Sequence, residues 1–305
     1  TIEIEEPAIM PDVGIYHPDA GIVFGDLESY LEWYGDDTGA HHVYNPENYT
    51  VGITFFTAGD EGICNVVIQS VITELEAKGI NVIPAYRPDV IYSDKAYSFF
   101  TIDGEWKTDA FIDLGKGVWI MPSAVRNTEY LEEANVPVIN GIIYQGTIEE
   151  WENSSTGQDC WFQYQIPIME IGGEIESIVV GGQEYDEDLG ARVLKPIDYQ
   201  IDWLVDRTIN WIDLQHTENE DKKVAVIYYT HGKQSALVAS NLDVVPSMPN
   251  FLDAMNQSGY DLGGTQLNDS EFLETVLQQG RNIGVWAPGE LEYMVENYDV
   301  KLLPV

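Results

Sequence analysis

A Gly-Lys pair that follows an apolar run is the first feature that could do chemistry. "KVAVIYYTHGKQSALVAS" places Gly232 and Lys233 after a predicted buried strand, where a nucleotide-binding protein has its phosphate loop. A phosphate loop also needs a glycine five residues before the second glycine and a Ser or Thr after the lysine. Ile227 and Gln234 occupy those positions. The pair therefore does not predict a nucleotide site, and Lys233 is open to another ligand or to solvent.

Two histidines and a glutamate are the other candidates. His17 in "YHP" could bind a metal ion or accept a proton; the alternative is a hydrogen bond to nearby backbone before Pro18. His231 directly follows a strand end, a position from which loops often carry function, so a functional and a structural role are both open. Glu170 in "IMEIGGEIE" follows an apolar run, and burial there would raise the pKa of its carboxyl group. The alternative for Glu170 is a hydrogen-bonded turn beside the two glycines.

Short apolar runs alternate with helical patterns along much of the chain. Residues 50–56 and 80–86 read as buried strands, and between them residues 63–79 carry apolar side chains at helical spacing and end at a glycine. A strand, a helix and a strand in this order predict a parallel βαβ unit. The pattern continues with a strand at 109–114, a helix around 127–135 and a strand at 136–143.

This alternation is interrupted and then resumes. Residues 144–196 hold an extended stretch, "WFQYQIPIME", and a strand-like segment bounded by glycines; residues 197–216 predict one long helix. Ser247 is predicted to cap a later helix, with Asp243 bracing the loop before it. The later elements are a strand at 223–229, helices near 247–258 and 270–280, a strand in "NIGVWA" and a helix from Pro288.

These patterns predict an α/β fold of two lobes with mainly parallel sheets flanked by helices, joined by a bridging segment and a long helix. Open α/β sheets bind ligands beyond the carboxyl ends of their strands. The loops at 57–62 and 230–246 are therefore the expected site. Four domains are predicted. An aromatic-rich lead-in at 1–49 packs on the first lobe at 50–145, and the bridge with its helix at 146–221 leads to the second lobe at 222–305.

Charge limits the possible partners. The 305 residues include 52 Asp and Glu against 14 Lys and Arg, a formal net charge of −38 spread along the chain. Such a surface repels phosphates, so nucleic-acid binding is not expected. The acidity indicates adaptation to a salty cytoplasm, as in halophilic or archaeal proteins, and a docking face for a basic partner or a metal ion is the alternative. An envelope location also stays open.

Neither the cysteines nor the apolar runs indicate a special class. Cys64 and Cys160 lack the spacing of a metal site, and whether they form a disulfide stays open. No apolar run approaches the ~20 residues that cross a bilayer. The first residues carry no signal-peptide pattern.

The stretch around the Gly-Lys pair resembles a known family. "KVAVIYYTHGKQSALVASNLDVVPSMPNFLDAMNQSGYDLGG" combines a strand, a Gly-Lys loop, an LDVxxS segment that leads into a helix, and "GY" at its end. This combination is similar to the large subunit of the cobalt and magnesium chelatases, the CobN and magnesium-chelatase H family. Other blocks resemble the family in the same order: "GIYHPDA", "ESYLEWY", "VGITFF", "VITELEAKGINVIPAY", "NVPVINGIIYQGTIEEW" and "IPIMEIGGEIES".

Two loops depart from the family pattern. Thr57 and Ala58 stand where the family usually has an Arg-Ser pair, and the Gly-Lys loop lacks the family's prolines. Both loops belong to the expected cleft, so the departures concern the identity of the ligand.

The resemblance implies a function for the parent protein. In this family the large subunit holds a tetrapyrrole and a divalent metal substrate, cobalt or magnesium, as in cobalamin biosynthesis, while separate AAA+ subunits hydrolyse ATP. The expected partners are the tetrapyrrole, the AAA+ and middle subunits and the remainder of the large subunit, and no cofactor is expected on this chain itself. Family members are several times longer, so the chain is expected to be an amino-terminal fragment that is inactive alone. A stand-alone receptor of the periplasmic-binding type, for a tetrapyrrole or another small molecule, is the alternative.

Metal insertion also requires groups that accept pyrrole protons, for which carboxylates and imidazoles are suited. Lys233 could pair with an acidic or amide edge of the tetrapyrrole. The ligand-binding candidates are His17, Thr57, Glu170, His231, Lys233, Asp243 and Ser247, with His17 and His231 as metal candidates; no catalytic residue is identified.

Overall fold

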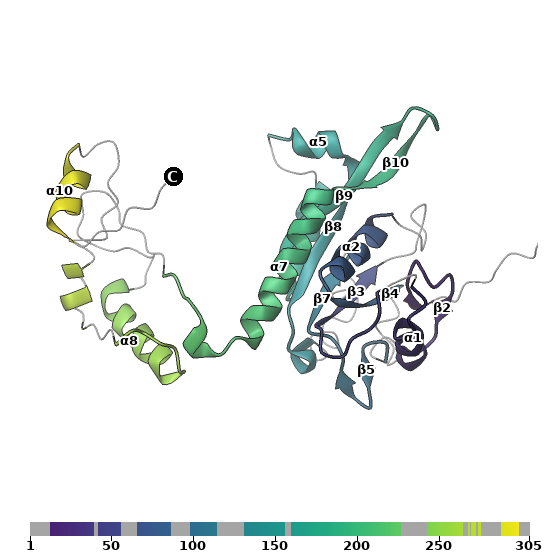
Figure 1. The fold of residues 1–305 in the computed structure, drawn as a ribbon. Helices are drawn as coiled ribbons and strands as arrows, with labels where there is room; N and C mark the ends of the chain where they lie inside the picture. Colours follow the sequence, from purple (N-terminus) through teal and green to yellow (C-terminus); the bar gives the residue numbers. More distant parts are fainter. Residues whose placement is uncertain are drawn as a thin grey trace, which may run out of the picture. The chain divides into compact units, whose positions relative to one another are not determined.

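The computed structural model divides the chain into two compact units, Thr1–Gln215 and His216–Val305 (Figure 1). For residues 160–164 only the backbone is described. The structure describes residues 13–39, 42–55, 66–86, 98–114, 131–155, 160–226, 243–264, 268, 270–272, 274–275 and 288–298.

An eight-stranded sheet is the centre of the first unit, with the strand order β10-β9-β8-β7-β3-β4-β1-β2. The inner strands β4, β3, β7, β8 and β9 run parallel to one another, whereas β1, β2 and β10 are added antiparallel at the two edges. This confirms the predicted α/β class with a mainly parallel sheet. The strands are β1 (Gly14–Tyr16), β2 (Val23–Phe24), β3 (Thr50–Phe55), β4 (Asn81–Tyr86), β7 (Ala110–Asp113), β8 (Val138–Thr147), β9 (Ile175–Asp186) and β10 (Ala191–Pro196); β5 (Thr101–Ile102) and β6 (Glu105–Trp106) pair separately.

The predicted βαβ unit is present as β3, α2 (Val66–Ala77) and β4. α2 turns one apolar stripe, which includes Val67, Val71 and Leu75, into the core. β3 and β4 are buried along their whole length, as strands of a sheet covered on both faces are. After β4 the chain returns to the other side of β3 and forms β7. The strand order therefore reverses between β3 and β7.

The lead-in adds one edge of this sheet. α1 (Leu27–Tyr34) begins at Asp26, whose carboxylate accepts a hydrogen bond from the amide of Ser29 at 2.8 Å. Leu27, Tyr30 and Tyr34 are buried, so this helix packs one apolar face on the core. β1 pairs with β2 on one side and with β4 on the other.

One stretch that was predicted to be extended is a helix. α6 runs over Cys160–Ile171 and has Pro167 in its interior. The alternation of aromatic and polar residues in "WFQYQIPIME" matches the period of a strand only locally. Met169 is buried, and Ile166 packs on a small apolar cluster of the sheet. Packing against the sheet thus outweighs the local pattern and the cost of an internal proline.

The segment predicted to bridge two lobes adds strands to the sheet of the first unit. The strand expected between glycines is confirmed as β9, which pairs with β8 and forms a hairpin with β10. β10 was not predicted. The short helix α5 (Ile148–Glu152) begins with a capping box, in which the side chains of Thr147 and Glu150 bond to each other's backbone amides.

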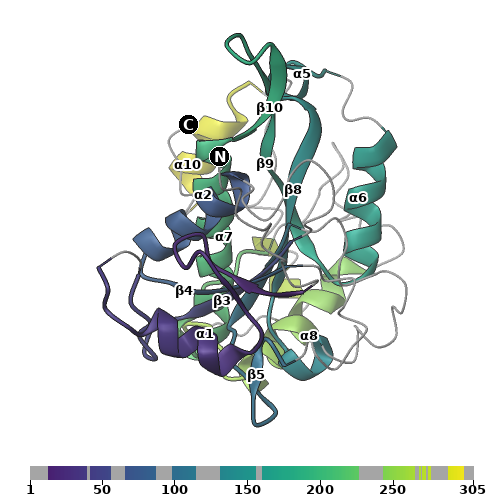
Figure 2. The same ribbon diagram turned by 90° about the vertical axis from the view of Figure 1, so that its right-hand side faces the viewer.

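Helices cover both faces of the sheet. The predicted long helix is α7 (Asp198–His216), which turns an apolar stripe into the core. It lies beside α2, because Lys78 of the α2 end bonds to the carboxylates of Asp202 and Asp206 at 2.6 Å each. α6 lies on the opposite face of the sheet from α2 and α7 (Figure 2).

The described residues of the second unit contain helices and no strand. η2 (Asn219–Asp221), α8 (Val244–Gln257) and α10 (Glu290–Asn297) are present, and residues 270–272 are helical. The helices predicted near 247–258 and from Pro288 are thus confirmed. Residues 223–226, the described part of a predicted strand, are not in a strand, and "NIGVWA" lies outside the described residues. A second α/β lobe therefore stays a prediction.

Candidate functional site

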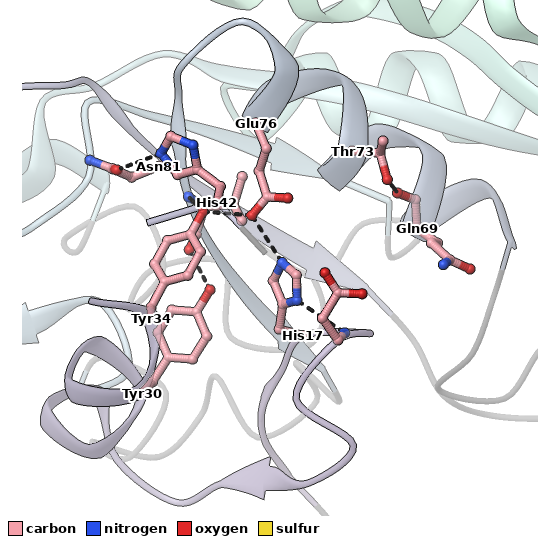
Figure 3. A network of polar contacts seen from close by, with 10 residues as sticks. His17, Tyr30, Tyr34, His42, Gln69, Thr73, Glu76 and Asn81 are labelled. Carbon is pink, nitrogen blue, oxygen red and sulfur yellow. Dashed lines mark hydrogen bonds and ion pairs between the residues drawn. The ribbon is translucent and has the colours of Figure 1, made fainter. Parts of the chain in front are cut away.

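His17 follows β1 and lies in the interior of the first unit, with 1% of its surface exposed. Its Nδ1 accepts a hydrogen bond from the amide of Asp19 at 3.2 Å, and its Nε2 lies 3.0 Å from Oε1 of Glu76 on α2 (Figure 3). Because Nδ1 accepts, the proton is assigned to Nε2, which donates to Glu76. The imidazole also lies 5.3 Å, between ring centroids, from Trp33.

Two tyrosines of α1 extend this network. The hydroxyl of Tyr34 donates to Glu76 at 2.8 Å and accepts from the amide of Val82 at 3.2 Å, while Tyr30 donates to the carbonyl of Val82 at 2.7 Å (Figure 3). Burial, and then the charge of Glu76, raise the pKa of Tyr34 well above its usual range. The network joins α1, α2 and β4. His17 therefore has a structural role in this arrangement, and metal binding by His17 stays a prediction.

A row of polar side chains crosses the sheet where the strand order reverses. Thr54, Asp113 and Asn140 are register partners on β3, β7 and β8, so their side chains lie on the same face. Oγ1 of Thr54 donates to Asp113 at 3.0 Å. The amide of Asn140 donates to Ser177 of β9 at 2.9 Å and to the carbonyl of Gln165 at 3.4 Å, which places the row on the α6 face.

A β-bulge sets the position of the β9 residues. Ile139 pairs with Ile175 and Gly141 with Ile178, so β9 has one extra residue between these pairs. Glu176 lies in the bulge with a φ of 54°, in the left-handed region. The guanidinium of Arg207 and Nε1 of Trp211, both on α7, donate to its carboxylate. α7 thus holds the bulge from one face while Ser177 joins the polar row on the other.

Glu174 adds a second carboxyl group to the row. It directly precedes β9 and is 1% exposed, as is Asp113. Neither carboxyl oxygen of Glu174 has a hydrogen-bond donor among the described side chains and backbone. Burial, and then the charge of Asp113, raise the pKa of Glu174 to about 10. Because this pKa lies above 7, the Asp113–Glu174 pair holds a proton at neutral pH.

This arrangement has the position and the chemistry of a ligand site. The carboxyl ends of strands at a reversal of strand order are where open α/β sheets bind ligands. Thr54 and Asp113 lie at such ends of β3 and β7, and Asn140 near the start of β8 and Glu174 directly before β9 add oxygen atoms beside them. The pair can exchange a proton with a ligand. We therefore take these four residues, with Ser177, as the candidate site.

The structure places only some of the predicted site residues. Thr57, His231 and Lys233 lie outside the described residues. Glu170 lies on α6 with an exposed side chain, so the expectation of a buried carboxyl group applies instead to Glu174, four residues later. The polar row itself was missed; its signals were single polar residues within apolar runs, as in "AFIDL", "VINGII" and "GGEIES".

Asp243 and Ser247 lie in the second unit. Asp243 is the N-cap residue of α8 by position, without a side-chain capping bond. Ser247 is inside the helix, where its hydroxyl donates to the carbonyl of Asp243. The prediction that Ser247 caps the helix is therefore wrong, because the helix begins one turn earlier. The Ser247 hydroxyl instead bonds to a backbone carbonyl of the preceding turn.

A hollow of about 520 Å³ beside α8 is lined by polar and apolar residues of the second unit, among them Asp253, Asp261 and Glu271. It contains no residue predicted as a ligand. Within the described ranges, no three His, Cys, Asp or Glu side chains come together as a metal site. None of the described helices combines the length and apolar character needed to cross a bilayer.

Comparisons with known proteins extend over nearly the whole chain. The family model described as CobN/Magnesium Chelatase matches residues 1–303. Magnesium-chelatase subunit ChlH of rice is 26% identical over 293 residues, covering 90% of this chain and 20% of the rice protein. An uncharacterized protein of Methanocaldococcus jannaschii is 28% identical, covering 92% of this chain and 24% of that protein. The aerobic cobaltochelatase subunit CobN of a Sinorhizobium species is 23% identical, covering 82% of this chain and 20% of that protein.

The fold is also that of a solved structure. The catalytic subunit of cobaltochelatase from Mycobacterium tuberculosis superimposes with a TM-score of 0.64 at 17% identity, over 92% of this chain and 22% of that protein. The chain spans about a fifth to a quarter of the length of these relatives. The match of the family model over residues 1–303 confirms the resemblance seen in the sequence blocks. This chain belongs to the CobN/magnesium chelatase family.

Proposed function

We propose that this chain is the tetrapyrrole- and metal-handling part of the large subunit of a cobalt or magnesium chelatase. The observation that carries the proposal is the family match over residues 1–303, in which relatives are named as magnesium-chelatase and cobaltochelatase subunits. Cobalt or magnesium is the metal substrate, and separate AAA+ subunits hydrolyse ATP. A cytoplasmic location is part of the proposal.

The candidate site supports a ligand-handling role. Thr54 and Asp113 lie at the reversal of strand order, where the parallel strands β3 and β7 end on the same side of the sheet. The two-lobe arrangement belongs to this proposal.

Because the chain spans about a fifth of the rice relative, the proposal assigns it one wall of the complete site. Alone it binds a tetrapyrrole weakly and inserts no metal. Joined to the remainder of a large subunit, and supplied with the AAA+ and middle subunits, ATP and metal, it supports insertion.

A two-step experiment tests this function. First, the chain is titrated with tetrapyrroles and followed in the Soret absorbance, with a micromolar or weaker dissociation constant expected. Second, the chain replaces the matching segment of a full-length CobN-type subunit, and metal insertion is measured. Failure of both steps overturns the proposal. Tight binding without any insertion in the second step supports a stand-alone receptor instead.

A further inference from the structure

The Asp113–Glu174 pair is unusual among the described carboxyl groups of the first unit. Both side chains are 1% exposed, and Asp113 accepts a hydrogen bond from Thr54. Glu174 receives none from the described residues at either oxygen. Glu176, two residues further on, is instead bound by Arg207 and Trp211. The described residues thus provide donors for one glutamate of this segment and not for the other.

Stability of the fold does not account for the pair. A buried carboxyl group without donors is unfavourable by a few kcal/mol, and apolar residues of similar size at such positions are often neutral or stabilising. Asp113 of this pair is the last residue of β7, at the reversal of strand order, where ligands bind in this fold class. The buried oxygen atoms of Glu174 at this position therefore point to a ligand that brings positive charge.

We propose that Asp113 and Glu174 form a binding site for a small divalent cation that prefers oxygen ligands. The cation takes the place of the proton between the two carboxyl groups, and that proton leaves to solvent. Thr54 can add its hydroxyl oxygen. Asn140 uses its amide nitrogen for Ser177 and Gln165, so its carbonyl oxygen is the ligand atom that remains.

The chemistry of the site selects the class of cation. All the polar side chains of the row offer oxygen, and none offers imidazole nitrogen or thiolate, which favours hard cations such as Mg²⁺ and Mn²⁺. Mg²⁺ is commonly held by one or two carboxylates, with other oxygen atoms completing the shell. Two carboxylates balance the charge of one divalent ion, and an anion is disfavoured by the same charges.

Two neighbouring glutamates of the described residues leave this balance intact. Asp113 is the charged group that acts on Glu174. Glu176 is neutralised by Arg207 on the α7 face, and Glu170 is exposed on α6. The inference deepens the proposed metal handling, and in that respect rests on the proposed function. Its test requires neither a tetrapyrrole nor a partner subunit, so its failure is distinguishable from a failure of the tetrapyrrole titration.

Binding of Mn²⁺ to the whole chain tests the site. Free Mn²⁺ is measured by electron paramagnetic resonance in about 0.5 M KCl, which screens diffuse binding to the acidic surface. We expect one site in the wild type that Mg²⁺ displaces. Glu174→Gln and Asp113→Asn should each weaken this site at least tenfold. Glu170→Gln, which removes an exposed carboxylate on the preceding helix, should leave it unchanged.

Folding of the variants is controlled in the same samples. Glu174→Gln keeps the size of the side chain and is neutral like a protonated carboxyl group, so this variant should keep the wild-type circular dichroism spectrum. Mn²⁺ should raise the melting temperature of the wild type and not that of this variant. Equal Mn²⁺ affinity in the wild type and a folded Glu174→Gln variant, or equal loss in Glu170→Gln, overturns the proposal.

Discussion

Glu170 and Glu174 show how one turn of chain decides the properties of a carboxyl group. α6 ends in a Schellman motif, in which the amide of Glu174 bonds to the carbonyl of Met169 at 3.0 Å and Gly173 has a φ of 96°. This turn leaves Glu170 on the exposed side and carries Glu174 into the core. Because the preceding stretch was predicted to be extended, the two glycines indicated a strand boundary. A helix assignment would have identified the glycine stop and the buried glutamate after it.

Replacing Glu174 should change how stability depends on pH. Burial, and then the charge of Asp113, raise the pKa of Glu174 from about 4.5 to about 10, so the folded state retains a proton where the unfolded chain has released it. The stability contributed by this group is therefore complete below pH 4.5 and is lost as pH rises toward 10. In Glu174→Gln this loss is absent, so the variant should gain stability relative to the wild type by up to about 1.4 kcal/mol per pH unit.

Urea denaturation at about pH 6 to 9, with EDTA present, measures this difference. Glu170→Gln is the matched control, because its carboxylate is exposed; its difference from the wild type should not change with pH. Parallel pH profiles for the wild type and Glu174→Gln would show that the pair does not retain a proton in the folded state.

Among the elements, those with a strong local pattern were the predictable ones. β3, α2 and β4 combine buried runs, a single apolar helix face and a glycine stop, and α7 carries an apolar stripe over its whole length. β10 lacks such a signal: its residues are exposed or half-buried, and pairing with β9 determines its conformation. α6 was mistaken because its conformation depends on packing against the sheet. The local sequence pattern thus predicts elements whose burial is uniform. It fails for elements whose conformation is determined by contacts with residues distant in the sequence.

The Tyr34 hydroxyl, which connects α1 to α2 and β4, should contribute to the stability of the fold. Tyr34→Phe removes the donor to Glu76 and the acceptor for the buried amide of Val82. We expect a loss of about 1–3 kcal/mol in the free energy of unfolding, because polar groups that remain buried lose a partner.

Denaturant unfolding of the wild type and the variant gives this value. Tyr199→Phe is the matched control, since Tyr199 is 56% exposed and its hydroxyl lies 3.5 Å from Glu152; a change within about 0.5 kcal/mol is expected there. Equal losses in the two variants would indicate that the Tyr34 hydroxyl has no special role in joining these elements.

For the whole molecule, the order of sequence blocks was more informative than any single motif. The blocks predicted the family, which the match over residues 1–303 bears out. The candidate site could not be obtained in this way, because Thr54, Asp113, Asn140 and Ser177 are far apart in the sequence and meet only through the strand order. Register between non-consecutive strands is set by the complete sheet and leaves no local signal.

The net charge of −38 should make the stability of the molecule depend strongly on salt. Like charges oppose a compact state more than an extended one, and screening by salt reduces this repulsion. Raising KCl from about 0.05 to about 1 M should therefore raise the melting temperature, and each kcal/mol gained corresponds to about 2–4 °C for a domain of about 150–250 residues. Because the chain forms two compact units, the midpoint of each transition is followed by calorimetry. Glycerol, which adds no ions, is the control solute. A melting temperature that does not change with KCl would mean that repulsion among the acidic groups does not limit the stability of the folded units.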